Sequence, residues 1–172
     1  MPSARPVLVA LVLAALLASP ATSLSQQAIS TAPIAIIVHP SNPVETLTLG
    51  ELRRIFMLDT QTWPHGRKIT VVLRDKGQPE RTEAIRMICG VTEHEYERQI
   101  LFRTFQGSVN IGPRAIQSAA AMLRFVHSAP GAIGYANADE VDGTVKLLRI
   151  DGLLPDHPRY PLRRRPRAPA GE

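Results

Sequence analysis

Three basic side chains surround one short segment whose residue types could bind an anion. Arg74 ends an apolar stretch that predicts a strand, Lys76 lies in the glycine-containing loop that follows, and Arg81 lies in the first turn of the next predicted helix. Free backbone N–H groups at a helix N-terminus attract anions, and nearby positive charges strengthen that attraction. The same pattern also fits an ordinary surface turn with solvated arginines, because Asp75 and Glu80 cancel part of the charge.

Residue patterns that support catalysis are missing from the sequence. It contains no Gly-x-Ser-x-Gly elbow, no Walker-type loop and no dinucleotide-binding glycine pattern. The five histidines are scattered and form no H-E-x-x-H pair, so a metal site is not expected. Glu93 and Glu97 lie one helical turn apart, but the helix dipole explains acidic residues in a first turn. We therefore expect no enzymatic activity and no cofactor.

The single cysteine, Cys89, lies in an apolar part of a predicted helix. One cysteine cannot form an internal disulfide, so the fold does not depend on one. No histidine or second cysteine stands at metal-ligand spacing from it, and Cys89 is expected to be a buried core thiol.

Apolar and β-branched segments bounded by turn residues predict strands, and apolar residues three or four positions apart predict helices. The strands are expected at residues 34–38, 69–73, 132–135 and 145–150. The helices are expected from Thr48 to about Met57, from Pro79 to about Gly90, from Thr92 to about Phe102, and from about Arg114 to His127. Because strands and helices alternate, the sequence predicts an α/β fold whose sheet is at least partly parallel.

Local signals refine this arrangement. Capping boxes at residues 48–51 (T-L-G-E) and 92–95 (T-E-H-E) mark two helix starts. In the helix that the second box opens, Leu101 is expected on the apolar side. Gly134 interrupts a predicted strand and indicates that another backbone approaches closely there.

The N-terminal residues have the layout of a cleavable secretory signal peptide. Arg5 precedes an apolar run over residues 7–18, and small residues follow at 21–23. The run of about a dozen residues is shorter than the roughly 20 that a membrane-spanning helix needs. We expect residues 1–23 to be removed, and no cysteine follows to carry a lipid anchor. The protein is therefore expected to be soluble in the periplasm.

The net charge of +5 comes mainly from the end of the chain. Four of the last ten residues are arginines, and without these, Arg5 and Glu172 the remainder holds 15 Lys and Arg against 14 Asp and Glu. A nearly neutral domain is expected at residues 30–155, and no nucleic-acid partner is expected. Residues 156–172 are expected to form a disordered Arg/Pro-rich tail, for which binding to an acidic surface is the alternative.

Five segments of the chain combine into a recognisable set: I-A-I-I-V-H-P-S-N-P-V at 34–44, E-L-R-R-I-F at 51–56, T-W-P-H-G at 62–66, L-F-R-T-F-Q-G at 101–107 and P-G-A-I-G-Y at 130–135. Together they resemble the phosphate ABC transporter substrate-binding proteins, in particular short, roughly single-lobe members of the type 2 periplasmic binding protein-like group. The resemblance implies a periplasmic binding protein lobe, with a mixed, mostly parallel sheet flanked by helices.

The resemblance also implies a ligand and its contacts. In two-lobed relatives an oxyanion such as phosphate lies between the lobes, held by hydroxyls and backbone N–H groups that include a Ser-Gly-Thr loop. This chain has G-Q-P-E-R-T at residues 77–82 in the place of that loop. The positions that correspond to the anion site are Ser41, Asn42, Arg74, Arg81 and Thr82.

Two functions follow from this reading. The first is a periplasmic solute-binding-like protein that binds a small oxyanion, phosphate by resemblance, in connection with an ABC-type permease or another membrane partner. The second is an accessory or sensory interaction module that keeps the fold without binding a ligand. A single lobe would bind its ligand weakly unless it formed a homodimer or docked on a partner.

Overall fold

The computed structural model describes residues 31–108 and 112–164. The predicted signal peptide, residues 1–23, lies outside the described residues, as do residues 165–172 of the predicted tail. Within the described ranges, no helix combines the length and the apolar character needed to cross a bilayer.

The described part of the chain alternates between strands and helices. The strands are β1 (Ile34–Val38), β2 (Thr46–Leu47), β3 (Thr70–Arg74), β4 (Arg114–Ile116), β5 (Ala132–Asn137) and β6 (Lys146–Ile150). The helices are α1 (Leu49–Phe56), α2 (Pro79–Cys89), α3 (Glu93–Phe105), α4 (Ala119–Ser128) and the short 3-10 helix η1 (Ala138–Glu140). The predicted α/β class is confirmed.

All six strands join one sheet in the order β2-β6-β1-β5-β3-β4. β3 runs parallel to β4 and β5, and β2 runs parallel to β6. β1 is antiparallel to both of its neighbours, β5 and β6. The sheet is therefore mixed with a majority of parallel pairs, as predicted.

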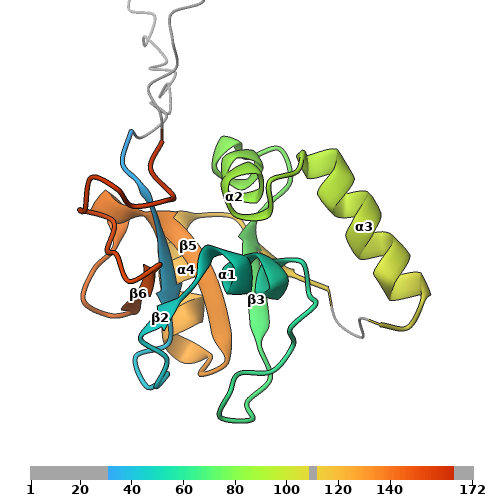
Figure 1. Ribbon diagram of the computed structural model, residues 1–172, viewed down its shortest axis with the longest axis horizontal. Helices are drawn as coiled ribbons and strands as arrows, with labels where there is room; N and C mark the ends of the chain where they lie inside the picture. The colour runs from blue at the N-terminus through green and yellow to red at the C-terminus, as the bar shows by residue number, and fades with distance from the viewer. Residues whose placement is uncertain (1–30, 109–111, 165–172) are drawn as a thin grey trace, which may run out of the picture.

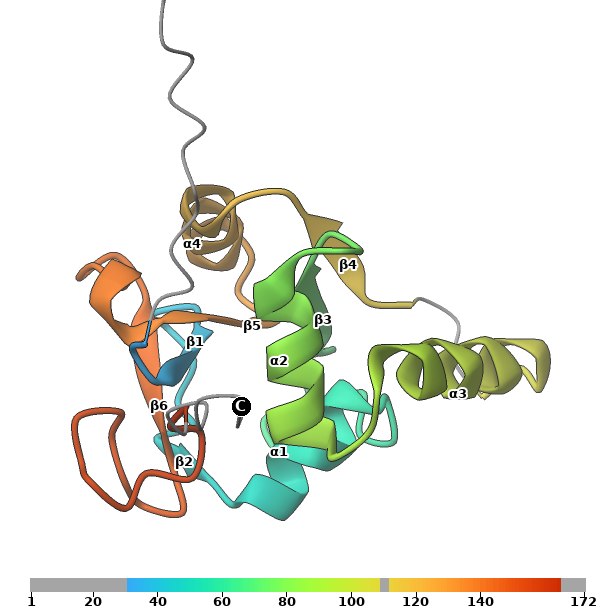
Figure 2. The same cartoon turned by 90° about the horizontal axis from the view of Figure 1, so that it is seen from above.

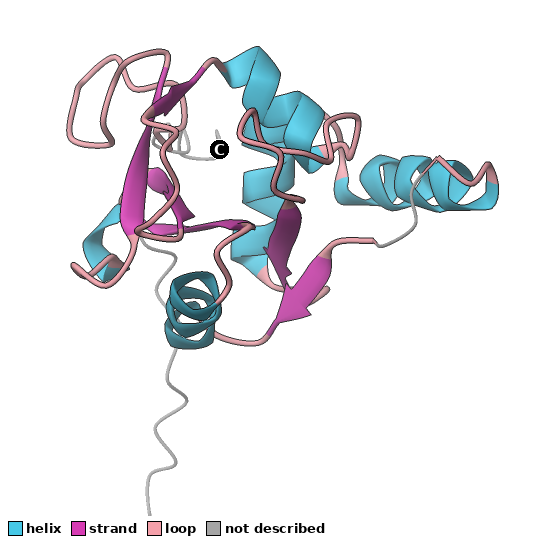
Figure 3. Ribbon diagram, turned by 90° about the horizontal axis from the view of Figure 1, so that it is seen from below, coloured by secondary structure: helices cyan, strands magenta, loops and turns pink. Residues whose placement is uncertain are grey.

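Helices cover both faces of this sheet (Figure 2), with α1 and α2 on one face and α4 on the other. Side chains of a strand alternate between faces, and β1 shows this plainly. Ile36 lies in the core cluster under α1 and α2, whereas Ile37 packs with Met122 of α4. Figure 3 shows the same layering from below, with α4 on the opposite side of the sheet from α1 and α2.

The predicted starts of α1, α2 and α3 and the predicted end of α2 agree with the structure. The hydroxyls of Thr48 and Thr92 accept hydrogen bonds from the first turns of α1 and α3, and both capping boxes are complete. Gly90 ends α2 in the left-handed conformation, at φ +70°. Capping was readable from the sequence because it depends on residues within one turn of each other.

The prediction of a helix from Arg114 to His127 was wrong at its start. Residues Arg114–Ile116 form strand β4, which pairs with β3, and α4 begins only at Ala119. The Ser118 hydroxyl accepts a hydrogen bond from the Ala121 N–H at 3.1 Å and fixes that start. Residues Arg114–Ile116 pair with the edge of β3 and therefore form a strand. Helical periodicity in the sequence cannot reveal such a long-range pairing.

The close backbone approach predicted at Gly134 occurs instead at Gly131. A Cβ on Gly131 would overlap the carbonyl oxygen of Lys68, so the chain needs glycine there. At Gly134 the near neighbours are side chains of α4, with Met122 Sδ 2.8 Å from the position of a Cβ. Gly134 therefore makes room for a packed helix and not for a second backbone.

The predicted tail, residues 156–172, begins later than expected. Tyr160 and Leu162 are buried in the core under α1 and α2, and the Ile34 N–H donates to the Leu162 carbonyl at 2.9 Å. Residues 156–164 thus belong to the domain, and the prediction was wrong for them. Two large apolar side chains outweigh the surrounding Arg- and Pro-rich composition.

Helix α3 extends away from the body of the domain, beyond the β4 edge of the sheet (Figures 1 and 2). It runs to Phe105, three residues further than predicted. Tyr96 anchors it, because its hydroxyl donates to the Phe56 carbonyl at 2.9 Å. The expectation that Leu101 lies on a covered apolar side was wrong, since Leu101 is 57 % exposed.

Candidate functional site

A cavity of about 290 Å³ opens where β3 and β5 end. Open α/β sheets bind ligands at the carboxyl ends of their strands, because loops and helix N-termini meet there. The polar residues that line this cavity are Arg74, Glu80, Ser118, Asn137, Glu140 and Arg164.

Arg74, the last residue of β3, brings a positive charge to the cavity. Its backbone is fixed at both polar atoms, since its N–H donates to the Tyr135 hydroxyl at 3.1 Å and its carbonyl accepts from Arg81 Nη1 at 2.9 Å. Its side-chain Nε is buried and has no hydrogen-bond partner within the described residues. A buried N–H of this kind is costly unless a partner satisfies it.

Two helix N-termini also reach the cavity. Glu80, in the first turn of α2, and Ser118 with Ala119, at the start of α4, all line it. The first N–H groups of a helix have no intrahelical acceptor and carry partial positive charge. Two such ends and Arg74 therefore create a local preference for negative charge.

Acidic side chains oppose this preference. The Glu80 Oε2 atom is buried without a hydrogen-bond partner in the described part of the chain. Glu140 is engaged, because its Oε2 accepts from Asn137 Nδ2 at 2.8 Å. Arg164 is paired with Glu83 at 2.6 Å. Arg74 and Glu80 are thus oppositely charged groups of the cavity, each with a buried atom that lacks a hydrogen-bond partner among the described residues.

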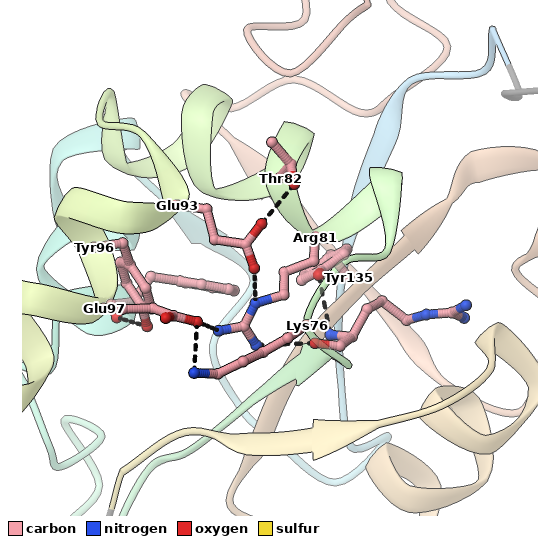
Figure 4. A network of polar contacts seen from close by, with 9 residues as sticks. Lys76, Arg81, Thr82, Glu93, Tyr96, Glu97 and Tyr135 are labelled. Atoms are coloured by element: carbon pink, nitrogen blue, oxygen red, sulfur yellow. Dashed lines mark hydrogen bonds and ion pairs between the residues drawn. The ribbon is translucent and has the colours of Figure 1, made fainter.

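Arg81 lies beside Arg74 but faces α3, within the network drawn in Figure 4. It is only 6 % exposed, and its guanidinium contacts Glu93 at 2.6 Å and Glu97 at 3.3 Å. The Thr82 hydroxyl donates to the other oxygen of Glu93 at 2.6 Å. An anion would have to displace two carboxylates to reach Arg81.

Lys76 extends the same network, with its Nζ 3.0 Å from Glu97 (Figure 4). The network joins the loop after β3 and the first turn of α2 to the first half of α3. Glu93 and Glu97, interpreted from the sequence as helix-dipole residues, are thus also partners of a buried arginine.

Ser41 and Asn42 lie at the opposite end of the sheet from Arg74. β1 is antiparallel to β5, so its last residue, Val38, pairs with Ile133 near the start of β5. The five-residue strand separates the two ends by roughly 16 Å, which is too far for one small anion to contact both. The structure therefore brings Arg74, Arg81 and Thr82 together and leaves Ser41 and Asn42 apart.

The loop of Ser41 and Asn42 is held by its own contacts. The Ser41 hydroxyl lies 2.8 Å from His39 Nδ1. Asn42 is buried, its Oδ1 accepts from the Val44 N–H at 3.0 Å, and its carbonyl accepts from Lys146 Nζ at 2.8 Å. These contacts shape a turn after β1.

Burial raises the pKa of one hydroxyl at the cavity and of one thiol elsewhere in the core. It raises the pKa of Tyr135 well above the ordinary value, so this hydroxyl stays protonated while it accepts from Arg74. It also raises the pKa of Cys89 to about 12, as expected for a core thiol. Across residues 31–108 and 112–164, no group of three or more His, Cys, Asp or Glu side chains could hold a metal ion.

Several lining residues were not identified from the sequence. Ser118, Asn137 and Glu140 come from elements whose neighbours in space are set by strand order, which sequence periodicity does not encode. The serine before an apolar helix was a readable N-cap signal. This signal predicts where α4 begins. Only the order of the strands in the sheet shows that the N-terminus of α4 lies next to that of α2.

Comparisons with known proteins give a consistent picture of the fold. A family model described as "PBP superfamily domain" matches residues 9–153. No curated protein matches the chain. Among solved structures, the chain is similar to an ABC-type phosphate transport receptor from Vibrio cholerae, with 22 % identity and a TM-score of 0.59 over 72 % of this chain and 48 % of that chain.

A second solved structure is as similar. It is a putative phosphate ABC transporter substrate-binding protein from Clostridium perfringens with bound phosphate, which shares 23 % identity and a TM-score of 0.60 over 72 % of this chain and 47 % of that one. The chain thus spans about half the length of these two proteins. At such identities the likeness shows the fold.

Proposed function

Because this chain belongs to the PBP superfamily domain family, we propose that it is a periplasmic solute-binding-like protein. Its proposed ligand is a small oxyanion, and phosphate is the expected one. The two solved structures named above are described as phosphate transport proteins, and the one from Clostridium perfringens contains bound phosphate. Delivery of the ligand to an ABC permease is part of this proposal. The expected export by a signal peptide belongs to it as well.

One observation carries the proposal: the buried Arg74 Nε has no hydrogen-bond partner among the described residues, and it belongs to a cavity that two helix N-termini also line. An oxyanion would satisfy this N–H with a charge-assisted hydrogen bond. It would also accept from first-turn N–H groups of α4 and from the Glu80 N–H of α2, whose first residue, Pro79, has no N–H. The site therefore consists of Arg74, Ser118, Ala119 and the start of α2, and Arg81 with Thr82 supports it from behind.

Glu80 sets the kind of anion. Its buried carboxylate oxygen can be satisfied only by a donor, since an ionised carboxylate accepts hydrogen bonds and does not donate them. Phosphate near neutral pH carries a proton that it can donate, whereas sulfate carries none. A site with such an acceptor rejects the analogue that lacks the proton, so phosphate is expected to bind better than sulfate.

Thermal melts of the purified protein in millimolar phosphate or sulfate test this function. A ligand at 100 times its dissociation constant stabilises the folded state by about 2.7 kcal/mol. Phosphate is expected to raise the melting temperature and sulfate to raise it less. No shift with either anion would contradict the proposal.

The accessory or sensory module remains the second candidate, and one observation favours it. Helix α3 exposes Leu101, Phe102 and Phe105, which a protein acting alone has no reason to keep on its surface. This function predicts no anion effect in the melts. Both candidates place the protein in the periplasm, where mass spectrometry of the secreted form should find an N-terminus near Leu24.

A further inference from the structure

The end of α3 carries a surface stripe that the fold does not use. Arg98, Leu101, Phe102 and Phe105 recur at the i, i+3, i+4, i+7 spacing of one helix face. Leu101 is 57 % exposed, Phe102 62 % and Phe105 83 %. A different side of the helix meets the body, through buried Tyr96. The side of α3 that carries Tyr96 is thus covered by the rest of the described domain, whereas the side that carries the stripe is exposed.

A groove of about 550 Å³ runs beside this stripe. Tyr96, Ile100, Leu101 and Thr104 of α3 line one part of it, and Ala115 of β4 lines another. Arg98 lies on its rim together with Lys76, which is paired with Glu97 at 3.0 Å. One chain therefore presents both an apolar helix end and an apolar groove of matching chemistry.

We infer that this surface, the α3 stripe with its groove, is the interface of a two-fold dimer formed with a second copy of this chain. A two-fold interface needs a patch that is complementary to itself, and an apolar helix end beside an apolar groove meets that condition. Antiparallel packing places the C-terminal end of each α3, with its partial negative charge, toward Arg98 of the other copy.

The charged residue of the stripe fits the same arrangement. When two antiparallel copies of α3 cross between Leu101 and Phe102, Arg98 of one copy lies opposite Phe105 of the other. A guanidinium over an aromatic ring gives a favourable cation–π contact, and two-fold symmetry makes it twice. The arginine inside an otherwise apolar stripe then has a partner.

The exposed apolar side chains of the stripe account for about half of a standard interface. With about 200 Å² for each large side chain, the exposed fractions of Leu101, Phe102 and Phe105 amount to roughly 400 Å² per copy. Two copies contribute about 800 Å², which is half of the roughly 1,600 Å² that a standard interface buries. We therefore expect a weak dimer.

The test is the molar mass of the purified protein by light scattering and sedimentation between about 1 and 500 μM. The wild type is expected to approach twice the mass of one chain. Phe105→Glu places two charges in the interface and is expected to weaken dimerisation at least tenfold. The matched control, Leu147→Glu, changes an exposed apolar residue on β6 and is expected to dimerise as the wild type does.

Hydrogen exchange of α3 gives a second readout. Amides of residues 98–105 should gain protection as the wild-type concentration rises, and they should show no such gain in Phe105→Glu. A wild type that stays monomeric at 500 μM overturns the inference and leaves the stripe to a membrane partner. A dimer that Phe105→Glu leaves intact overturns the placement of the interface. Neither result bears on anion binding at the Arg74 cavity.

Discussion

Two arginines that lie seven residues apart have opposite surroundings. In the described part of the chain the buried Nε of Arg74 has no hydrogen-bond partner, whereas the Arg81 guanidinium contacts two carboxylates and a carbonyl. Sequence reasoning treated both as anion ligands, because charge and proximity to a helix start are equal for the two. The distinction depends on which face of α2 packs against α3, which no local pattern records.

Replacement of Arg81 by Ala is expected to lower the free energy of unfolding by about 2 kcal/mol. The change leaves Glu93 and Glu97 without their shared partner, and the removal of one member of a buried ion pair costs more than the pair contributes. Urea unfolding measures this. Arg86→Ala is the control, since its side chain is 68 % exposed and the expected change is within about 0.5 kcal/mol. Unchanged stability in Arg81→Ala would contradict its structural role.

Gly131→Ala is expected to destabilise the fold by at least about 2 kcal/mol, because the new Cβ meets the Lys68 carbonyl and the backbone has to shift. Gly143→Ala is the matched control, since a Cβ at Gly143 meets nothing within 4 Å and the expected change is within about 0.5 kcal/mol. Thermal or urea unfolding of both variants measures the two changes in the free energy of unfolding. Equal effects of the two substitutions would show that the close approach is absent.

At the scale of the elements, the predictable parts were those defined within a few residues. The capping boxes, the Pro79 start of α2 and its Gly90 end were all readable. The start of α4 and the exposed side of α3 were not, because each depends on a partner far away in the sequence. β4 forms a strand because its residues pair with the edge of β3.

Glu95, the acidic member of the second capping box, makes the stability of α3 depend on pH. Hydrogen bonds from the Thr92 backbone and hydroxyl lower the pKa of Glu95 below its ordinary value of 4.5. A depressed folded-state pKa contributes stability that is present above 4.5 and is lost as the pH falls through the lowered value. Glu95→Ala should therefore be less stable than the wild type at pH 7.

Urea unfolding of both proteins from pH 7 down to pH 3 follows the difference between them. The gap is expected to shrink below about pH 4.5, as the wild-type carboxylate is protonated and loses its hydrogen bonds. A gap that stayed constant over this range would mean that the side chain acts through helix propensity and not through the cap.

At the scale of the whole molecule, the chain has the fold of half of a phosphate-binding protein. The segments that resembled the family indicated this fold, since they span most of the sheet and its covering helices. The site was less predictable. The order of the strands separates Ser41 and Asn42 from Arg74. It also brings Ser118 and Asn137, which no sequence motif indicated, into the lining of the Arg74 cavity.

The most direct test of the account is a calorimetric titration of phosphate into wild type, Arg74→Gln and Arg86→Gln. The wild type and Arg86→Gln, which removes an exposed charge, are expected to bind phosphate equally and more tightly than sulfate. Arg74→Gln is expected to lose at least tenfold in affinity, about 1.4 kcal/mol, because the charge-assisted hydrogen bond is gone. Phosphate binding that Arg74→Gln leaves unchanged, or no binding by the wild type, would contradict the account.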